Sequence, residues 1–230
     1  MHKFAALSIT CLVYVMGLGI AHAQTLSPEA QAIVQRVQSA ISNEEARQAV
    51  LPPATTDTEV IERLGRLDQA GRAQLDMQAI QALAPDERRA ARSAAYRFIE
   101  ARDRQNQVVL ATLVPTGGWW SADEYGPDAA SSAFLIVQHA GEDWWRRYLP
   151  ALKTEAAAGR LSGEAYAQMA DRLALIEKRP QSYGTQAVCE EGRFIVYVID
   201  DPEVVDRRRA ALRMPPLAEF RTTLESWPSC

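Results

Sequence analysis

The segment ERRAARSAAYRFIEARDRQNQVVLATLV, Glu87 to Val114, decides the fold class, because its apolar residues recur with the period of an α-helix. Ala91, Ala95 and Ile99 fall on one stripe, and most of the arginines fall outside it. Such a helix buries its apolar stripe and keeps its charged face in water. The segment therefore predicts a long amphipathic helix that ends before Pro115.

Capping residues and helix breakers divide the rest of the chain into further helices. A capping serine followed by proline predicts a helix from Pro28 to about Ser42, and a second helical segment opens at Thr56-Asp57. After a loop at 116–127, rich in glycine and aromatic residues, we expect helices at 128–148, 150–158, 163–178, 203–213 and 217–227.

One segment has the composition of strands. AVCEEGRFIVYVID, residues 187–200, places β-branched and aromatic residues on either side of Glu191-Gly192, which predicts two short strands joined by a turn. The expected fold is mainly α, a single-domain helical bundle with one small β-hairpin near the C-terminus.

The N-terminal segment has the pattern of a secretory signal peptide. Lys3 precedes an apolar run from Phe4 to Ile20, and Ala21-His22-Ala23 offers a small-x-small cleavage site. We expect a periplasmic or secreted protein without a membrane anchor; an uncleaved anchor and a lipid-carrying Cys11 are the alternatives. The expected organisation is a signal peptide at 1–23, an N-terminal helical extension at 24–55 and one mainly helical domain at 56–230.

Removal of residues 1–23 would change the inventory of charged and catalytic groups. It leaves 24 basic and 29 acidic residues, a net charge of −5, which argues against nucleic acid or an anionic membrane as the partner. It also leaves His139 as the one histidine. Imidazole chemistry in the mature chain therefore requires His139.

Two cysteines remain after cleavage, Cys189 and Cys230. In an oxidising compartment such a pair predicts a disulfide, here one that ties the C-terminal tail to the domain. The alternative is that Cys189 acts as a nucleophile.

The stretch FLIVQHAGEDWW, Phe134 to Trp145, holds the strongest catalytic candidate. On a continuous helix Asp143 lies one turn beyond His139, where its carboxylate would accept the ring N–H and fix the tautomer. The alternative is a buried histidine that only satisfies its own hydrogen bonds. Asp171, on a neighbouring predicted helix, is a second candidate to orient His139, and Arg172 could hold a substrate carboxylate or phosphate. Equally, Asp171 and Arg172 could form a structural ion pair. The same two interpretations apply to Asp68, Gln69 and Arg72 on an earlier predicted helix, and there the structural one is favoured.

Two loops add candidate binding residues. In QSYGTQ, residues 181–186, Tyr183, Thr185 and Gln186 offer donors for a developing negative charge; the alternative is a turn that satisfies its own backbone. Trp119 could stack on a ligand or, with Trp120, plug the end of the helical core.

The order of the polar motifs resembles an uncharacterised bacterial family, a domain of unknown function. The family pattern is Asp-Gln-x-x-Arg, Gly-Trp, Gln-His, Asp-Arg and Gln-x-Tyr-Gly-Thr-Gln. In this chain the corresponding residues are Asp68-Gln69 with Arg72, Asp103 with Asn106, Gly118-Trp119, Gln138-His139, Asp171-Arg172 and 181–186, over about residues 56–220. The resemblance implies a shared polar site that includes Gln138, and it implies no activity.

These observations lead to an expected function. No phosphate-binding glycine loop, nucleophile elbow or dinucleotide fingerprint is present, so we expect no cofactor. A metal would need Asp143 and Asp171 beside the single histidine, so none is expected. The main hypothesis is an exported, metal-independent acid-base hydrolase or lyase centred on His139, acting on a small polar molecule. The alternative is a non-catalytic module for ligand or protein binding, in which the His139 network is structural.

Overall fold

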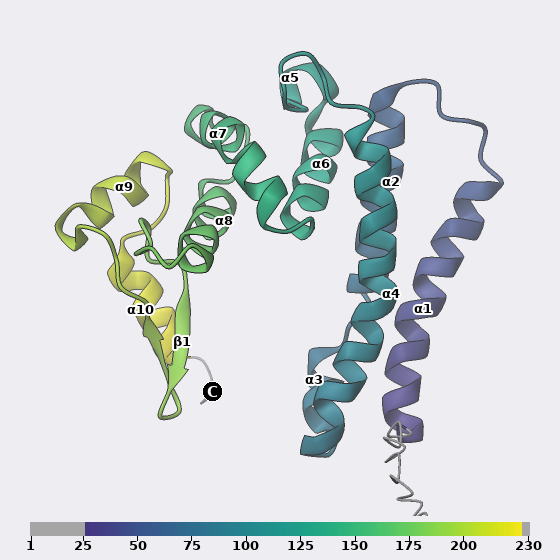
Figure 1. Ribbon diagram of the computed structural model, residues 1–230, viewed down its shortest axis with the longest axis horizontal. Helices are drawn as coiled ribbons and strands as arrows, with labels where there is room; N and C mark the ends of the chain where they lie inside the picture. The colour runs from purple at the N-terminus through teal and green to yellow at the C-terminus, as the bar shows by residue number, and fades with distance from the viewer. Residues whose placement is uncertain (1–25, 227–230) are drawn as a thin grey trace, which may run out of the picture.

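The computed structural model describes residues 26–226, and the predicted signal peptide lies outside them. Helices dominate the described chain, as predicted (Figure 1). The N-terminal half contains α1 (Pro28–Ala49), α2 (Asp57–Arg72), α3 (Met77–Ala82) and α4 (Pro85–Ala111). The rest contains α5 (Ala122–Tyr125), α6 (Pro127–His139), α7 (Glu142–Ala158), α8 (Gly163–Ile176), the 3-10 turn η1 (Pro202–Val204), α9 (Val205–Ala211) and α10 (Leu217–Ser226).

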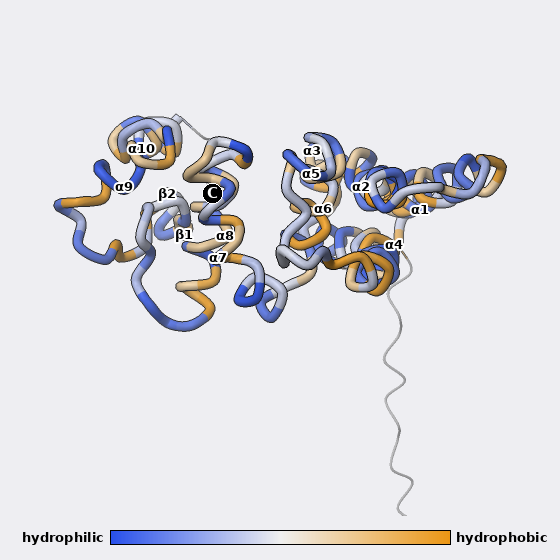
Figure 2. The backbone as a smooth tube through the Cα atoms, turned by 90° about the horizontal axis from the view of Figure 1, so that it is seen from above, coloured by the Kyte–Doolittle hydropathy of each residue, from blue (hydrophilic) through white to orange (hydrophobic). Residues whose placement is uncertain are grey.

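The elements follow one another across an elongated molecule. Helix α1 packs against α2 and α4 at one end, α6 packs on α2, and α7 connects this group to α8. The hairpin, α9 and α10 lie at the other end (Figure 1). Seen from above, hydrophilic and hydrophobic stretches alternate along the helices, as amphipathic packing requires (Figure 2).

Helices α1 and α2 begin directly after the serine and threonine that the sequence predicts as their capping residues. The Ser27 hydroxyl accepts the backbone N–H of Ala30 at 3.2 Å, and the Thr56 hydroxyl accepts that of Glu59 at 3.2 Å. Helix α1 runs seven residues past the predicted end at Ser42, to Ala49, because no breaker intervenes before Pro52.

The hairpin is confirmed. Strand β1 (Ala187–Glu190) pairs antiparallel with β2 (Arg193–Val196), and the turn between them is Glu191-Gly192. The predicted Cys189–Cys230 disulfide stays a prediction, because Cys230 lies outside the described residues.

The largest hydrophobic cluster joins the two ends of the molecule. It contains Trp120, Tyr148 and Leu152, and Trp119 packs edge-on against Trp120 and Tyr148 at 5.7 and 5.8 Å between ring centroids. The two tryptophans of the 116–121 loop therefore lie in the core. Two smaller clusters hold α1 against α3 and α4.

The predicted helix at 128–148 is wrong in one respect that matters for function. The helix ends at His139, Gly141 adopts a φ of 91°, and α7 begins at Glu142. Glycine reaches this left-handed region without the strain that a side chain would cause. His139 and Asp143 consequently lie on two different helices. Within the described residues, no helix is both long enough and apolar enough to span a bilayer.

Candidate functional site

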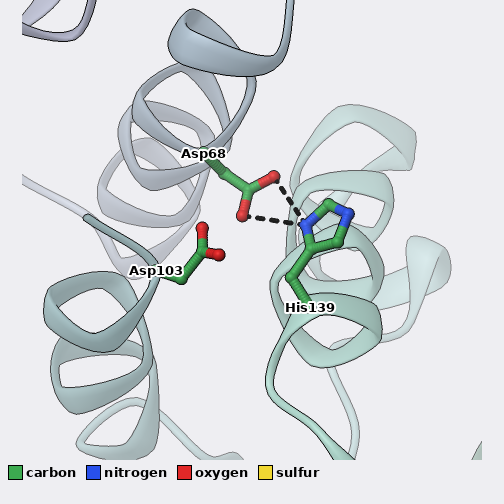
Figure 3. A group of neighbouring side chains, drawn as sticks. All are labelled: Asp68, Asp103 and His139. Atoms are coloured by element: carbon green, nitrogen blue, oxygen red, sulfur yellow. Dashed lines mark hydrogen bonds and ion pairs between the residues drawn. The ribbon is translucent and has the colours of Figure 1, made fainter. Parts of the chain in front are cut away.

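His139, the last residue of α6, meets a buried carboxylate of α2. Its Nδ1 lies 3.1 Å from Oδ1 and 3.0 Å from Oδ2 of Asp68, whose side chain is fully buried. Figure 3 shows the imidazole facing Asp68, with the carboxylate of Asp103 from α4 nearby. We call Asp68, Arg72, Asp103 and His139 the Asp68–His139 site.

A close helix crossing brings the two side chains together. A Cβ added to Gly65 of α2 would lie 2.2 Å from Oγ and 2.5 Å from Cβ of Ser132 on α6, so only glycine allows this approach. The end of α6 is fixed by Trp145, whose Nε1 donates to the carbonyl oxygens of Val137 and Gln138 at 3.1 Å each. The helix end that carries His139 is thus held from both sides.

Arg72 holds the two carboxylates of the site. Its Nη1 and Nη2 donate to the two oxygens of Asp103 at 2.8 and 2.7 Å, and its Nη1 lies 3.4 Å from Oδ1 of Asp68. Burial alone would lower the pKa of Arg72, but the hydrogen bonds that it donates to Asp103 and the charges of both aspartates outweigh it and raise that pKa. The guanidinium therefore stays charged between the two acids.

Two amides complete the surroundings. Gln69 Nε2 donates to Asp68 Oδ2 at 2.7 Å. Asn106 is fully buried and its Nδ2 donates to the carbonyl of Leu64 at 3.3 Å, while its Oδ1 has no hydrogen-bond partner within the described chain. The contact between Gln69 and Asp68 fixes the carboxylate that faces His139.

The two ring nitrogens of His139 have different surroundings. Nδ1 faces Asp68, whereas Nε2 has no hydrogen-bond partner among residues 26–226, and the side chain is 19% exposed. A carboxylate that accepts an Nδ1–H leaves the Nε2 lone pair available. The arrangement is chemically able to take up and release a proton at Nε2.

Asp68, Asp103 and His139 are residue types that can bind a metal ion, but their hydrogen bonds make them a poor metal site. One ligand atom from each of Asp68, Asp103 and His139 lies within 4.8 Å of the others. However, Arg72 occupies both oxygens of Asp103, and Asp68 already bonds His139 and Gln69. A cation would have to displace the charged guanidinium.

Asp143 does not orient His139, contrary to the expectation from spacing. Because Gly141 separates the two helices, Asp143 projects into solvent with a side chain 94% exposed and pairs with Arg146 at 3.0 Å. The acid at His139 is Asp68, 71 residues away in sequence.

Asp171 binds the QSYGTQ loop and has no hydrogen bond to His139. Its buried carboxylate accepts the backbone N–H groups of Ser182 at 2.7 Å, Tyr183 at 3.0 Å and Thr185 at 2.9 Å, and the Thr185 hydroxyl at 2.9 Å. In this structure Asp171 therefore anchors the loop rather than orienting the imidazole.

The other candidates of this loop belong to the same network. Tyr183 stacks edge-on against Tyr166 at 5.9 Å, and burial raises the pKa of its phenol. Gln186 donates from Nε2 to the Thr185 hydroxyl at 3.2 Å and from its backbone N–H to Oε1 of Gln181 at 2.9 Å. Tyr183 thus reaches Asp171 through its backbone N–H and Gln186 through the Thr185 hydroxyl, and neither residue forms a hydrogen bond with His139.

The remaining candidates lie around α7. The Arg172 guanidinium lies 5.9 Å from the ring of Trp145, the same tryptophan that bonds the carbonyl of Gln138. Trp119 lines a pocket beside α6.

A surface groove lies between α2 and α6. Its volume is about 360 Å³, and we call it the α2–α6 groove. Six of its eight lining residues carry polar side chains; the lining comprises Glu62, Gly65, Arg66, Gln69, Asp128, Ser131, Ser132 and Leu135. Gln69 links the groove to Asp68, and Leu135 lies one helical turn before His139.

Sequence reasoning gave Asp68 and Arg72 the same two interpretations as Asp171 and Arg172, favoured the structural one, and named Asp103 only as part of a motif. The available signal was their spacing, because Asp68 and Arg72 are four residues apart on one helix and Asp103 and Asn106 three apart on another.

Comparison with known proteins supports the resemblance drawn from the motifs. The model of DUF6624, described as a family of unknown function, matches residues 67–227, which include the whole Asp68–His139 site. No curated protein and no solved structure gives a significant match.

Proposed function

Since the chain belongs to DUF6624, a family of unknown function, its activity has to be inferred from the site, and we propose an acid-base hydrolase or lyase with His139 as the reacting group. One observation carries this proposal. Both carboxylate oxygens of buried Asp68 face Nδ1 of His139, and Nε2 on a partly exposed ring has no partner within residues 26–226.

Each residue then has a distinct role. Asp68 holds the imidazole in the tautomer that carries its proton on Nδ1, so that Nε2 accepts a proton from water or substrate and returns it to the leaving group. Arg72 and Gln69 are positioning residues, because they touch Asp68 and not the reacting nitrogen. Asp103 fixes Arg72 through two hydrogen bonds. No step requires a metal.

The α2–α6 groove indicates the class of substrate. It carries two acids, one arginine, two serine hydroxyls and one amide, so it offers both donors and acceptors over its length. A small polar substrate with several hydroxyl or amide groups fits this lining better than an apolar one.

Export is part of the same proposal. The N-terminal pattern predicts cleavage after Ala23 and a periplasmic or secreted mature chain. The test is N-terminal sequencing of protein recovered from the periplasm or medium of a producing bacterium. We expect Gln24 as the first residue, and recovery of intact Met1 in the membrane fraction would contradict export of a cleaved chain.

The catalytic proposal is tested with two variants and a matched control. Asp68→Asn keeps the shape of the acid but removes its charge, and Asp143→Asn makes the same change at the exposed aspartate near His139 in sequence. Turnover of chromogenic esters, glycosides, phosphoesters and amides, and of hydroxy acids followed by NMR, is compared in wild type, both variants and His139→Gln.

We expect His139→Gln to abolish turnover and Asp68→Asn to lower kcat by roughly 100-fold or more. Asp143→Asn should equal wild type, and all variants should keep the wild-type circular dichroism spectrum. Turnover that survives His139→Gln, or that falls with Asp143→Asn but not with Asp68→Asn, would refute the proposed roles.

The alternative function is a non-catalytic ligand-binding or protein-interaction module. The observation that favours it is the set of hydrogen bonds from Arg72 to Asp68 and Asp103, which would lock α2 against α4 without any chemistry. If this alternative holds, His139→Gln should lower the thermal midpoint of unfolding, and the wild-type protein should turn over none of the test substrates.

A further inference from the structure

His139 lies at a corner of the chain, where α6 ends and α7 begins. Ala140 and Gly141 form the connection, and Gly141 has a φ of 91° and a ψ of −176°. A Cβ at Gly141 would meet no atom within 4 Å, so the backbone conformation, and not a lack of space, requires glycine here. We call Ala140, Gly141 and Trp145 the α6–α7 corner.

Trp145 closes this corner from the first turn of α7. Its backbone N–H donates to the carbonyl of Gly141 at 3.1 Å, and its side chain is buried in the largest hydrophobic cluster. Its indole Nε1 donates to the carbonyl oxygens of Val137 and Gln138 at 3.1 Å each. One residue therefore bonds the end of α6 and the glycine that follows it.

The indole bond to Gln138 bears directly on His139. The carbonyl of Val137 also accepts the backbone N–H of Ala140, whereas among residues 26–226 Trp145 is the one hydrogen-bond partner of the Gln138 carbonyl. This carbonyl belongs to the peptide group that joins Gln138 to His139. Because a peptide group is planar, the indole fixes the plane from which the His139 side chain projects.

The contact between His139 and Asp68 leaves little tolerance for a movement of that plane. Nδ1 lies 3.1 and 3.0 Å from the two carboxylate oxygens, near the ordinary hydrogen-bond length. Asp68 is not free to follow the imidazole, because its side chain is fully buried and bonded by Gln69 at 2.7 Å. A displacement of about 1 Å at a reacting group can cost roughly 100-fold in rate.

Contacts between α7 and α8 are weaker supports of the corner. Arg146 donates from Nε to Glu177 at 2.9 Å, and the exposed Arg172 lies 5.9 Å from the ring of Trp145. Interactions between side chains that remain in water contribute little, because water screens their charges. The buried bonds of Trp145 and the backbone of Gly141 are therefore the stronger constraints.

We propose that the α6–α7 corner positions His139, with Trp145 and Gly141 setting the peptide plane and, through it, the contact of Nδ1 with Asp68. This inference rests on the proposed function at His139. It adds that α7, which contributes no side chain to the Asp68–His139 site, determines the geometry of that site. Trp145 and Gly141 are positioning residues, since they act through His139.

Two substitutions perturb the corner, and each has a matched control. Trp145→Phe removes the indole N–H and keeps an aromatic ring, and Trp144→Phe makes the same change at the neighbouring residue, whose ring packs on Tyr148. Gly141→Ala strains the backbone at the end of α6, and Gly126→Ala does so at its start, where φ is 79° and ψ is 161°. A Cβ would meet no atom within 4 Å at either glycine.

The first readout does not require turnover. NMR of the nitrogen-labelled full-length protein at alkaline pH, with the imidazole neutral, shows which ring nitrogen of His139 carries the proton. The signals are assigned by their loss in His139→Gln. We expect the proton on Nδ1 in wild type and in both controls. Trp145→Phe and Gly141→Ala should shift the population toward the Nε2–H tautomer, because a loosened contact with Asp68 no longer selects Nδ1–H.

The second readout is turnover of whichever compound wild type accepts. We expect kcat to fall roughly 10- to 100-fold in Trp145→Phe and Gly141→Ala, with KM within about twofold of wild type, because the α2–α6 groove is unchanged. Both controls should keep wild-type kcat. If wild type turns over no compound, the proposed function fails, and the tautomer of His139 alone decides whether the corner positions the imidazole.

Two results would overturn the proposal. The first is a wild-type tautomer in folded Trp145→Phe; if that variant does not fold, the same result in Gly141→Ala, which removes no side-chain contact, has the same meaning. The second is a control that changes the His139 tautomer as much as its matched variant does. The corner would then contribute only general stability.

Discussion

Replacement of Gly65 by alanine should destabilise the protein, although alanine is the better helix former. The new Cβ would lie 2.5 Å from Cβ of Ser132, and no rotamer of serine moves that atom. Restoring a carbon–carbon contact of about 3.5 Å requires α2 and α6 to separate by about 1 Å. Overpacking of this kind costs about 1–3 kcal/mol, and alanine returns about 1 kcal/mol through helix propensity.

Because the contact is at the severe end of that range, we expect the free energy of unfolding to fall by a net amount of about 2 kcal/mol. For a chain of this size, this corresponds to a fall in the thermal midpoint of roughly 4–8 °C. Ser132→Gly in the same molecule removes the clashing Cβ and should restore more than half of the loss. Gly71→Ala is the comparison on the same helix: its Cβ would meet Ile41 Cδ1 at 2.9 Å, Ile41 Cγ1 at 3.0 Å and Ile99 Cγ1 at 3.1 Å, so it should also lose stability, but on the side of α2 that faces α1 and α4.

Urea denaturation of the four proteins measures these differences, and the NMR signals of His139 report its contact with Asp68. Separation of the helices should change the His139 signals in Gly65→Ala but not in Gly71→Ala. If Gly65→Ala is as stable as wild type, or if Ser132→Gly restores nothing, the close crossing does not hold the two helices in register.

Three further predictions concern the rest of the molecule. Arg72→Met leaves the carboxylate of Asp103 buried without its partner and should cost about 3–5 kcal/mol in urea denaturation; a second change, Asp103→Leu, should recover much of this, and no recovery would contradict the pairing. Burial raises the pKa of Tyr166 and Tyr183 above the ordinary 10.0, so the stability they contribute is full below pH 10 and is lost as the pH rises above it. Their phenolate absorbance should therefore appear only together with unfolding, and earlier ionisation in folded protein would refute the burial argument. Mass measurement of non-reduced, alkylated protein should show Cys189 and Cys230 protected from the reagent, and two labelled thiols would exclude the predicted disulfide.

Helices and hairpin could be predicted because they follow from local patterns, whereas the break after His139 could not. A glycine within a helical pattern is compatible with a continuous helix and with a helix end, since the cost of continuing is only about 1 kcal/mol. Here Trp145 decides the outcome by bonding the last carbonyls of α6. That contact depends on the packing of two helices and is not visible in their separate patterns.

Asp68 was not singled out as the partner of His139 for a related reason. Spacing along one helix identifies Asp143 as a neighbour, but Asp68 reaches His139 across a helix crossing that depends on Gly65 and Ser132. A sequence alone does not specify which helices cross or where.

The polar QSYGTQ segment illustrates a different limit. Its hydroxyl, phenol and amide groups suit a ligand site, yet in the fold the Thr185 hydroxyl and three backbone N–H groups of the loop bind the buried carboxylate of Asp171. Ligand-binding loops and self-satisfied loops draw on the same residue types, because both must supply donors to an anionic acceptor.

Helix α1 lies before the start of the DUF6624 match at residue 67, and its apolar contacts form two clusters separate from the main core. Val37 and Ile41 meet Ala95 and Ile99, and none of these four residues belongs to the Asp68–His139 site. Helix α1 therefore contributes through its packing on α4 and α2, and not through contacts within the Asp68–His139 site. Among related proteins, this helix should diverge faster than α2 or α6, with compensating changes concentrated on the stripe of α4 that it covers.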